Sequence, residues 1–262
     1  MEENKFFEGI KMGKVNIESF YEKLEFATFK PLNVVLEGEG GAGKEYFARL
    51  IHEKRDCQGD FIAFDWECDH TCQHQIMESL VKSHLSTMLS GTNQKRNTYF
   101  FRRIDLLSSQ AQLKIFEILE NETKREGLSR SQLHQLGLIA SAENKNGDEG
   151  TQNDLTLNRL LELFPLRITI TPLRQRKEEF GSLMHHILES VNKQLNRKVS
   201  GFSFETFYFF RDYHWPNNID ELRSEIEGAV ALTTDHDLIR PEVLSERLIK
   251  SQKILKMSNF SR

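Results

Sequence analysis

The sequence predicts an α/β fold, in which a parallel β-sheet flanked by helices is followed by a small all-helical domain. In the first part of the chain, short apolar runs alternate with amphipathic helical stretches, the pattern of a parallel sheet covered on both faces. From Thr171 onward the apolar spacing is helical, and Pro172 marks the change. We therefore expect two domains, residues 1–171 and 172–262.

Five apolar runs are expected to form the strands of the sheet, because short runs without polar alternation are typical of strands buried on both faces. They are Asn33–Leu36, Phe61–Asp65, Thr98–Ile104, Leu136–Ala142 and Leu166–Ile170. The second domain is expected to contain four helices. They are Gln175–Leu195, Ser203–Tyr213, Asn218–Thr233 and Arg240–Lys250. Ser203 suits an N-cap, and Asn217 can tolerate a left-handed turn.

Composition describes an ordinary globular chain. Hydrophobic residues make up 38% and charged residues 28% of the sequence, as in soluble domains. A formal net charge of −4 argues against a protein that coats nucleic acid. The chain has no apolar run of transmembrane length and no signal-peptide pattern at its N-terminus. We therefore expect a cytoplasmic protein whose three cysteines are free thiols.

A glycine-rich segment between the first strand and the following helix matches the G-x-x-x-x-G-K pattern of a phosphate-binding loop. Backbone N–H groups of such a loop surround phosphate oxygens, and its lysine reaches the outer phosphates. The predicted nucleotide-binding residues are Gly38, Gly40, Gly41, Ala42, Gly43, Lys44 and Glu45. The expected ligand is ATP or ADP, with or without magnesium. The alternative is a glycine-rich turn that holds no ligand.

Four ordered segments resemble the AAA+ ATPase domain of the sigma-54-dependent transcription activators. G-E-G-G-A-G-K-E at 38–45 is similar to that family's G-E-S-G-T-G-K-E, in which a Glu after the lysine is normal. The segments F-P-L-R-I at 164–168, P-L-R-Q-R-K-E-E at 172–179 and Y-H-W-P-N-N-I-D-E-L-R at 213–223 also have counterparts. The resemblance runs from about Ile17 to Leu248. It implies a P-loop AAA+ sheet with a helical lid, and contacts with other proteins.

The residues for hydrolysis depart from the family pattern. Aligned on Ile104, the acidic pair that supports magnesium and polarises water falls on Arg102 and Arg103. The family's threonine–asparagine sensor falls on Ala142–Glu143, with Asn144 one place late, and its two trans-acting arginines fall near Asp154 and Leu160. The arginine that the family has in the lid falls on Asp220. The loop with which the family grips sigma factor is missing between Asp69 and Thr98. We therefore predict no catalytic residues and no metal ligands, hence a pseudo-ATPase.

The interpretation that the sequence favours is a degenerate AAA+ domain that binds nucleotide and regulates transcription through protein contacts. Its partners would be AAA+ homologues or the transcription machinery, in an oligomer, without membrane or direct DNA binding. A competing hypothesis is an active ATPase that uses Asp105 or Glu143 with Arg159. Strand alternation places Asp105 on the opposite face from Arg102, which disfavours it. A nucleotide-free scaffold, and DNA binding through the lysines at 250, 253 and 256, are weaker hypotheses.

Three smaller features can each be interpreted in two ways. Arg102 and Arg103 could face the phosphates, or could pair with a carboxylate such as Asp220. Four potential metal ligands alternate over Cys68–His74, but zinc sites prefer two separated pairs, so a polar loop is the favoured interpretation. The dense aromatics over Phe202–Phe210 are expected to be mostly core, with a part left as a docking patch.

Overall fold

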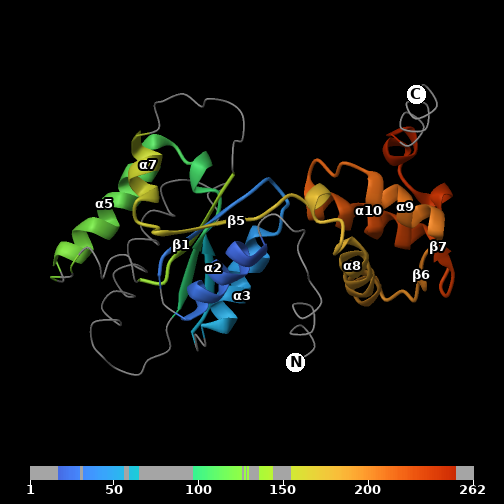
Figure 1. The fold of residues 1–262 in the computed structure, drawn as a ribbon, viewed down its shortest axis with the longest axis horizontal. Coiled ribbons are helices and arrows are strands. Elements are labelled where there is room, and N and C mark those ends of the chain that lie inside the picture. The colour runs from blue at the N-terminus through green and yellow to red at the C-terminus, as the bar shows by residue number, and fades with distance from the viewer. Residues whose placement is uncertain are drawn as a thin grey trace. The chain divides into compact units, whose positions relative to one another are not determined.

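A computed structural model describes residues 17–29, 32–55, 59–64, 97–125, 127, 129, 136–143 and 155–251. Within these ranges the chain divides into two compact units. An α/β unit contains Glu18–Glu39 and Gly43–Ile170, and a helical unit contains residues from Thr171 onward together with Gly40–Ala42. Figure 1 shows the sheet of the first unit and the helices of the second.

The α/β unit is built on a parallel five-stranded sheet in the order β2-β3-β4-β1-β5. The strands are β1 (Val34–Glu37), β2 (Phe61–Phe64), β3 (Thr98–Phe101), β4 (Ile139–Ala142) and β5 (Leu166–Thr169). All five predicted strands are confirmed, although each is four residues long. Strand β1 lies inside the sheet, where Val34 is in register with Ile139 of β4 and Leu166 of β5.

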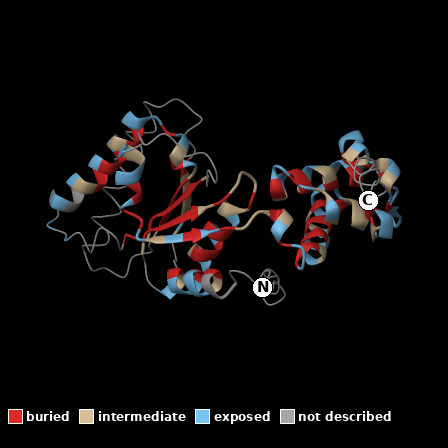
Figure 2. Ribbon diagram, turned by 45° about the horizontal axis from the view of Figure 1, so that its top comes forward, coloured by how far each residue is buried: buried red, intermediate tan, exposed pale blue. Residues whose placement is uncertain are grey.

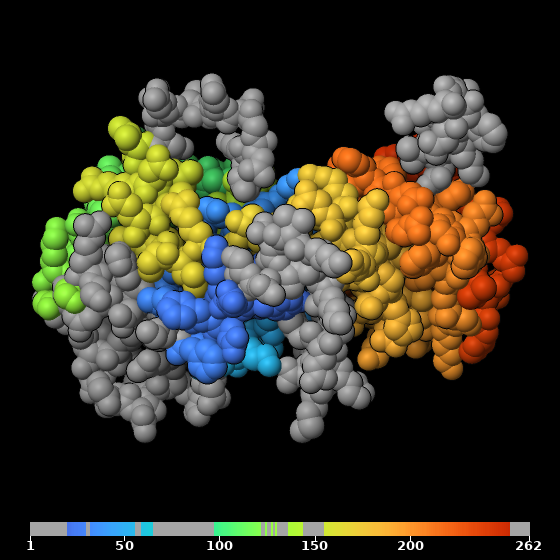
Figure 3. Space-filling model, in the orientation of Figure 1, coloured from blue at the N-terminus to red at the C-terminus, as the bar shows by residue number. Residues whose placement is uncertain are grey.

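Helices cover both faces of this sheet, as the alternation of elements predicts. On one face lie α2 (Ile17–Phe29) and α3 (Lys44–Lys54), whose Phe20 and Phe47 rings meet edge to face at 5.2 Å. On the other face lie α5 (Ser109–Arg125) and α7 (Leu155–Leu161), which share one apolar core with β3 and β4. The space-filling view shows α7, in yellow-green, at the surface of this unit (Figure 3). Strands β3 and β4 are fully buried and β1 nearly so, whereas the edge strands β2 and β5 are partly exposed (Figure 2).

A buried asparagine fixes the start of β1. The Asn33 amide donates to the Leu163 carbonyl at 2.9 Å, and its side-chain oxygen accepts from the Leu138 N–H at 3.0 Å. Asn33 is fully buried, so both bonds form away from water, where an unpaired amide would be costly. The side chain thereby links the segments that lead into β1, β4 and β5.

Strand β3 ends earlier than the sequence indicates. The predicted strand ran to Ile104, but the observed one stops at Phe101. Arg103 adopts a left-handed backbone conformation with φ 49°, and a 3₁₀ turn follows at Ile104–Leu106. Strand alternation therefore does not apply beyond Phe101, and it gives no basis for the predicted placement of Asp105 on the face opposite Arg102.

The helical unit contains α8 (Phe180–Leu195), α9 (Phe204–Asp212) and α10 (Asn218–Leu232), with 3₁₀ turns at Leu173–Gln175 and Pro241–Val243. The first predicted helix thus begins at Phe180, not Gln175. The last one is a 3₁₀ turn followed by helix from 246 to 251. Two short strands that the sequence did not indicate, β6 (Gly201–Phe202) and β7 (Leu238–Ile239), pair in parallel.

Two details of the helical unit concern its turns. The Ser203 hydroxyl accepts a hydrogen bond from the Thr206 N–H at 3.2 Å, which confirms the predicted N-cap of α9. The prediction for Asn217 was wrong, because its φ is −100°, whereas Asn218 has φ 49°. The Asn218 side chain is buried and accepts from the Leu173 N–H at 2.7 Å. This left-handed position therefore joins α10 to the start of the unit.

The helical unit also buries an ion pair. Arg176 and Glu179 have 5% and 3% of their side chains exposed, and the Arg176 Nη2 atom lies 3.1 Å from Glu179 Oε2. Burial raises the pKa of Glu179, while the neighbouring Arg176 charge acts in the opposite direction. A buried pair contributes little net stability, but removing one partner leaves an uncompensated charge.

None of the described helices is long and apolar enough to cross a membrane.

We expect Glu179→Ala to lower the free energy of unfolding of the helical unit by about 3–5 kcal/mol, because it leaves the Arg176 charge buried and unpaired. The double variant Arg176→Met with Glu179→Met should lose much less. Denaturant titration in a Trp66→Phe background reports this unit through the buried Trp215. A single variant as stable as the double variant would contradict this account of the pair.

Candidate nucleotide-binding site

The glycine loop follows the carboxyl end of β1 and leads into α3 (Figure 1). Gly41 and Gly43 have φ of 69° and 93°, in the left-handed region that glycine adopts without strain, and Gly43 is the N-cap of α3. A Cβ added at Gly38 would lie 2.8 Å from the Ile170 carbonyl oxygen, so a larger residue does not fit there. The backbone of this segment therefore requires the glycines that the motif predicted.

Lys44 is the first residue of α3, and its ammonium group rests against the loop. The Nζ atom donates to the carbonyl oxygens of Gly38 and Glu39, both at 2.7 Å. The first-turn N–H groups of a helix have no intrahelical acceptors and carry a partial positive charge. The loop, Lys44 and the start of α3 thus form a region suited to a polyphosphate.

The two arginines that follow β3 have different surroundings. The Arg102 Nη2 atom lies 2.6 Å from Glu45 Oε2, in a pair whose side chains are 32% and 36% exposed. The second carboxylate oxygen of Glu45 accepts from Arg49 Nη2 at 2.8 Å. Arg103 is exposed, and its backbone N–H donates to the Ser141 hydroxyl at 3.0 Å.

Of the two arrangements considered for these arginines, the salt bridge is the one observed for Arg102. Its carboxylate partner is Glu45, one residue after the loop lysine. Asp220, the partner suggested from sequence, lies in the first turn of α10 in the helical unit. The sequence did not indicate the roles of Ser141 and Arg49. Ser141 is the polar residue in an otherwise apolar strand, and Arg49 is at i,i+4 from Glu45, so both signals were present.

Asp105 lies in the 3₁₀ turn after Arg103, and its carboxylate oxygens are buried. Within the described part of the chain, neither oxygen has a hydrogen-bonding partner. Burial raises the pKa of Asp105. Nearby backbone N–H groups of Asp105 and Glu143, and the Lys44 ammonium, oppose this shift without making well-aligned hydrogen bonds. Among the charged side chains, Glu143 acts to raise the pKa of Asp105 and Lys44 acts to lower it.

The remaining positions singled out by sequence are distributed as follows. The Arg159 guanidinium stacks over the Phe116 ring at 4.4 Å, which joins α7 to α5. Leu160 is 1% exposed and belongs to the core, whereas Glu143 follows β4. Asn144, Asp154 and the Cys68–His74 cluster lie outside the described residues. In the ranges that are described, no group of three or more acids, histidines or cysteines could hold a metal ion.

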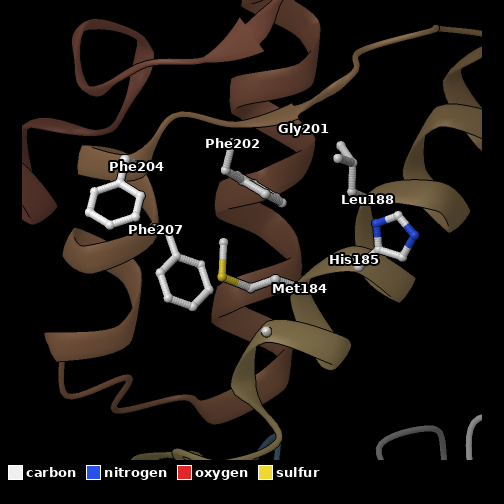
Figure 4. Close-up of a pocket in the computed structure, with 8 residues that line it drawn as sticks. Met184, His185, Leu188, Gly201, Phe202, Phe204 and Phe207 are labelled. Atoms are coloured by element: carbon white, nitrogen blue, oxygen red, sulfur yellow. The ribbon is translucent and has the colours of Figure 1, made fainter.

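The aromatic segment of the helical unit is mainly core. Phe210 is buried against Trp215, and Phe202 and Phe207 are partly buried. Phe204 is 78% exposed and borders an apolar hollow of about 370 Å³. Figure 4 shows this hollow between α8 and α9, with Met184 and three phenylalanines among the side chains that line it.

Comparison with known proteins agrees with this architecture. The model for the Sigma-54 interaction domain matches residues 10–166, which is more than half of the chain. This chain belongs to the family of sigma-54 interaction domains. The model for the AAA+ ATPase lid domain matches residues 174–259. Both the resemblance noted in the sequence and the predicted fold class are confirmed.

Curated relatives of this sigma-54 interaction domain are named as regulators or activators. The phenol regulator MopR of Acinetobacter guillouiae is 32% identical over 81% of this chain and 39% of its own length. XylR of Pseudomonas putida is 29% identical over 85% of this chain and 41% of its own. RocR of Bacillus subtilis is 28% identical over 85% of this chain and 50% of its own length. The chain thus spans half or less of these relatives.

The solved structures give the same fold. NtrX from Brucella abortus in complex with ADP has a TM-score of 0.63 at 16% identity, over 95% of this chain and 58% of NtrX. NtrX in complex with ATP has a TM-score of 0.62 at 18% identity, over 91% of this chain and 56% of NtrX. At these identities the comparison establishes the architecture.

We expect Asp105→Asn to stabilise the α/β unit at neutral pH, on the order of 1 kcal/mol, because it removes a buried carboxylate without hydrogen-bonding partners. The pKa of Asp105 is raised in the folded state, so protonation of Asp105 stabilises the fold at low pH. This stabilisation is lost as the pH rises through the folded pKa, and only then does the buried charge destabilise the unmodified protein. The gain should therefore disappear below the usual pKa range of aspartate. Urea unfolding at several pH values measures it, and a gain independent of pH would contradict this explanation.

Proposed function

We propose that this sigma-54 interaction domain binds ATP or ADP and does not hydrolyse it. The observation that carries the proposal is the loop after β1, in which two left-handed glycines lead into a helix that begins at Lys44. This geometry supplies backbone N–H groups and a cation for phosphate oxygens. The binding residues would be Gly38, Gly40, Gly41, Ala42, Gly43, Lys44 and Glu45. The NtrX structures with ADP and ATP support a nucleotide as the ligand of this fold.

The absence of hydrolysis is proposed from the end of β3. Hydrolysis requires a carboxylate that supports the metal and another that orients water. Arg102 and Arg103 occupy those positions in the family alignment, and a guanidinium can do neither. A lost arginine finger alone would cost about a thousandfold in rate. Arg159, the nearest candidate, stacks on Phe116 within its own unit.

The cellular role that we propose is transcription regulation through contacts with other proteins, in the cytoplasm of a bacterium. The relatives MopR, XylR and RocR are named as regulators, which supports this role. Partners would be AAA+ homologues in an oligomer, or the sigma-54 form of the transcription machinery. In this role nucleotide would act as a ligand that sets the state of the domain.

A second candidate function is hydrolysis with Asp105 as a displaced acid. The observation that favours it is that the Lys44 charge acts to lower the pKa of Asp105, against the larger effect of burial. Burial disfavours the ionised form that a catalytic carboxylate needs. Magnesium-dependent turnover that Asp105→Asn abolishes would establish this function and exclude the first proposal.

We expect calorimetry to show ATP and ADP binding that Lys44→Ala weakens on the order of tenfold to a hundredfold, the effect of losing a charge-assisted contact. Lys54→Ala is the matched control, because it removes the same charge from the exposed end of the same helix. No phosphate should be released in the same samples. Absence of binding in the unmodified protein would leave the scaffold interpretation, and steady turnover would refute the pseudo-ATPase.

A further inference from the structure

The fold implies magnesium beside the nucleotide, so the residues at that place decide whether the metal fits. In phosphate-loop proteins the ion is held by the side chain after the loop lysine and by an acid from the neighbouring strand. The corresponding residues here are Glu45 and Arg102. Magnesium needs oxygen ligands in a near-octahedral arrangement, and a guanidinium has five donors and no acceptor.

In the observed contacts, both oxygens of the carboxylate that would remain for a metal face arginines. One oxygen of Glu45 lies 2.6 Å from the Arg102 guanidinium, and its second oxygen accepts from Arg49 at 2.8 Å. Both cations therefore share one carboxylate next to Lys44. These residues do not fit a magnesium ion. They form instead a cationic group at the place where the metal would be held.

We propose that the Arg102 guanidinium replaces magnesium, so that this domain binds the metal-free nucleoside di- or triphosphate. This inference rests on the proposed nucleotide binding. Glu45 holds the guanidinium beside the first turn of α3, and the planar fork can bind two phosphate oxygens. The pair is about one-third exposed, so the guanidinium can exchange part of its contact with Glu45 for phosphate at low cost.

Arg49 provides a matched control within the same cluster. It pairs with the same carboxylate, but its guanidinium is also held over the Phe61 ring at 4.4 Å, and its side chain is 52% exposed. Substitution of Arg49 removes one positive charge near Glu45 without touching the residue aligned with the metal-binding acid. A general loss of charge and a specific loss of the metal substitute can thus be separated.

The experiment measures ATP and ADP affinity by calorimetry in excess EDTA and in excess magnesium. We expect the unmodified domain to bind at least as tightly in EDTA, because magnesium neutralises the phosphates that Arg102 would otherwise meet. Arg102→Gln should weaken binding in EDTA on the order of tenfold, the loss of one charge-assisted contact. Arg102→Lys should keep part of the affinity, and Arg49→Gln should match the unmodified domain. Thermal unfolding shows that each variant is folded.

The results separate this inference from the proposed function. Binding that requires magnesium in the unmodified domain would overturn the inference and leave nucleotide binding intact. Equal affinities of folded Arg102→Gln and unmodified domain in EDTA would also overturn it. If the unmodified domain binds neither ATP nor ADP in either buffer, the proposed function and this inference are overturned together. Equal weakening by Arg49→Gln would show that only the overall charge matters, which contradicts the role assigned to Arg102.

Discussion

The site depends on the interior position of β1 in the sheet. Strand β1 pairs with β4 on one side and β5 on the other, and Asn33 ties its start to both neighbours. Because parallel strands present their carboxyl ends at one edge, this placement brings the glycine loop beside the ends of β3 and β4. The contact of Arg102 with Glu45 follows from it, and the bond between Arg103 and Ser141 follows from the direct pairing of β3 with β4.

Two ion pairs of similar chemistry serve different purposes because their exposure differs. Arg176 and Glu179 are almost completely buried, so each charge depends on its partner and the pair fixes the turn before α8. Arg102 and Glu45 are about one-third exposed, where a pair contributes about 0–1 kcal/mol. Because water can solvate both charges when they separate, the Arg102–Glu45 pair rearranges at low cost. A guanidinium in this setting can remain positioned by Glu45 and still meet a phosphate.

The sequence was sufficient to predict the five strands, the α/β domain followed by a helical domain, and the glycine loop. These features depend on apolar periodicity and glycine spacing, which report local geometry. The sequence was insufficient where a long-range contact decides. The left-handed Arg103 ends β3, and its N–H bonds to Ser141, which is distant in sequence. Asn218, not Asn217, is left-handed, and its side chain accepts from the distant Leu173 N–H. The pairing of Arg102 with Glu45 likewise requires β3 and α3 to be adjacent.

Phosphate binding and phosphate transfer make different demands on this fold. Binding uses backbone N–H groups, a helix N-terminus and cations, which depend on glycine conformations and on the position of β1. Transfer also needs ionised carboxylates at set positions after β3, and these depend on individual side chains. Arginines at 102 and 103 are therefore compatible with the loop conformation that phosphate binding needs. Asp105 is poorly suited to supply such a carboxylate, because it is buried in a 3₁₀ turn where the ionised form is disfavoured.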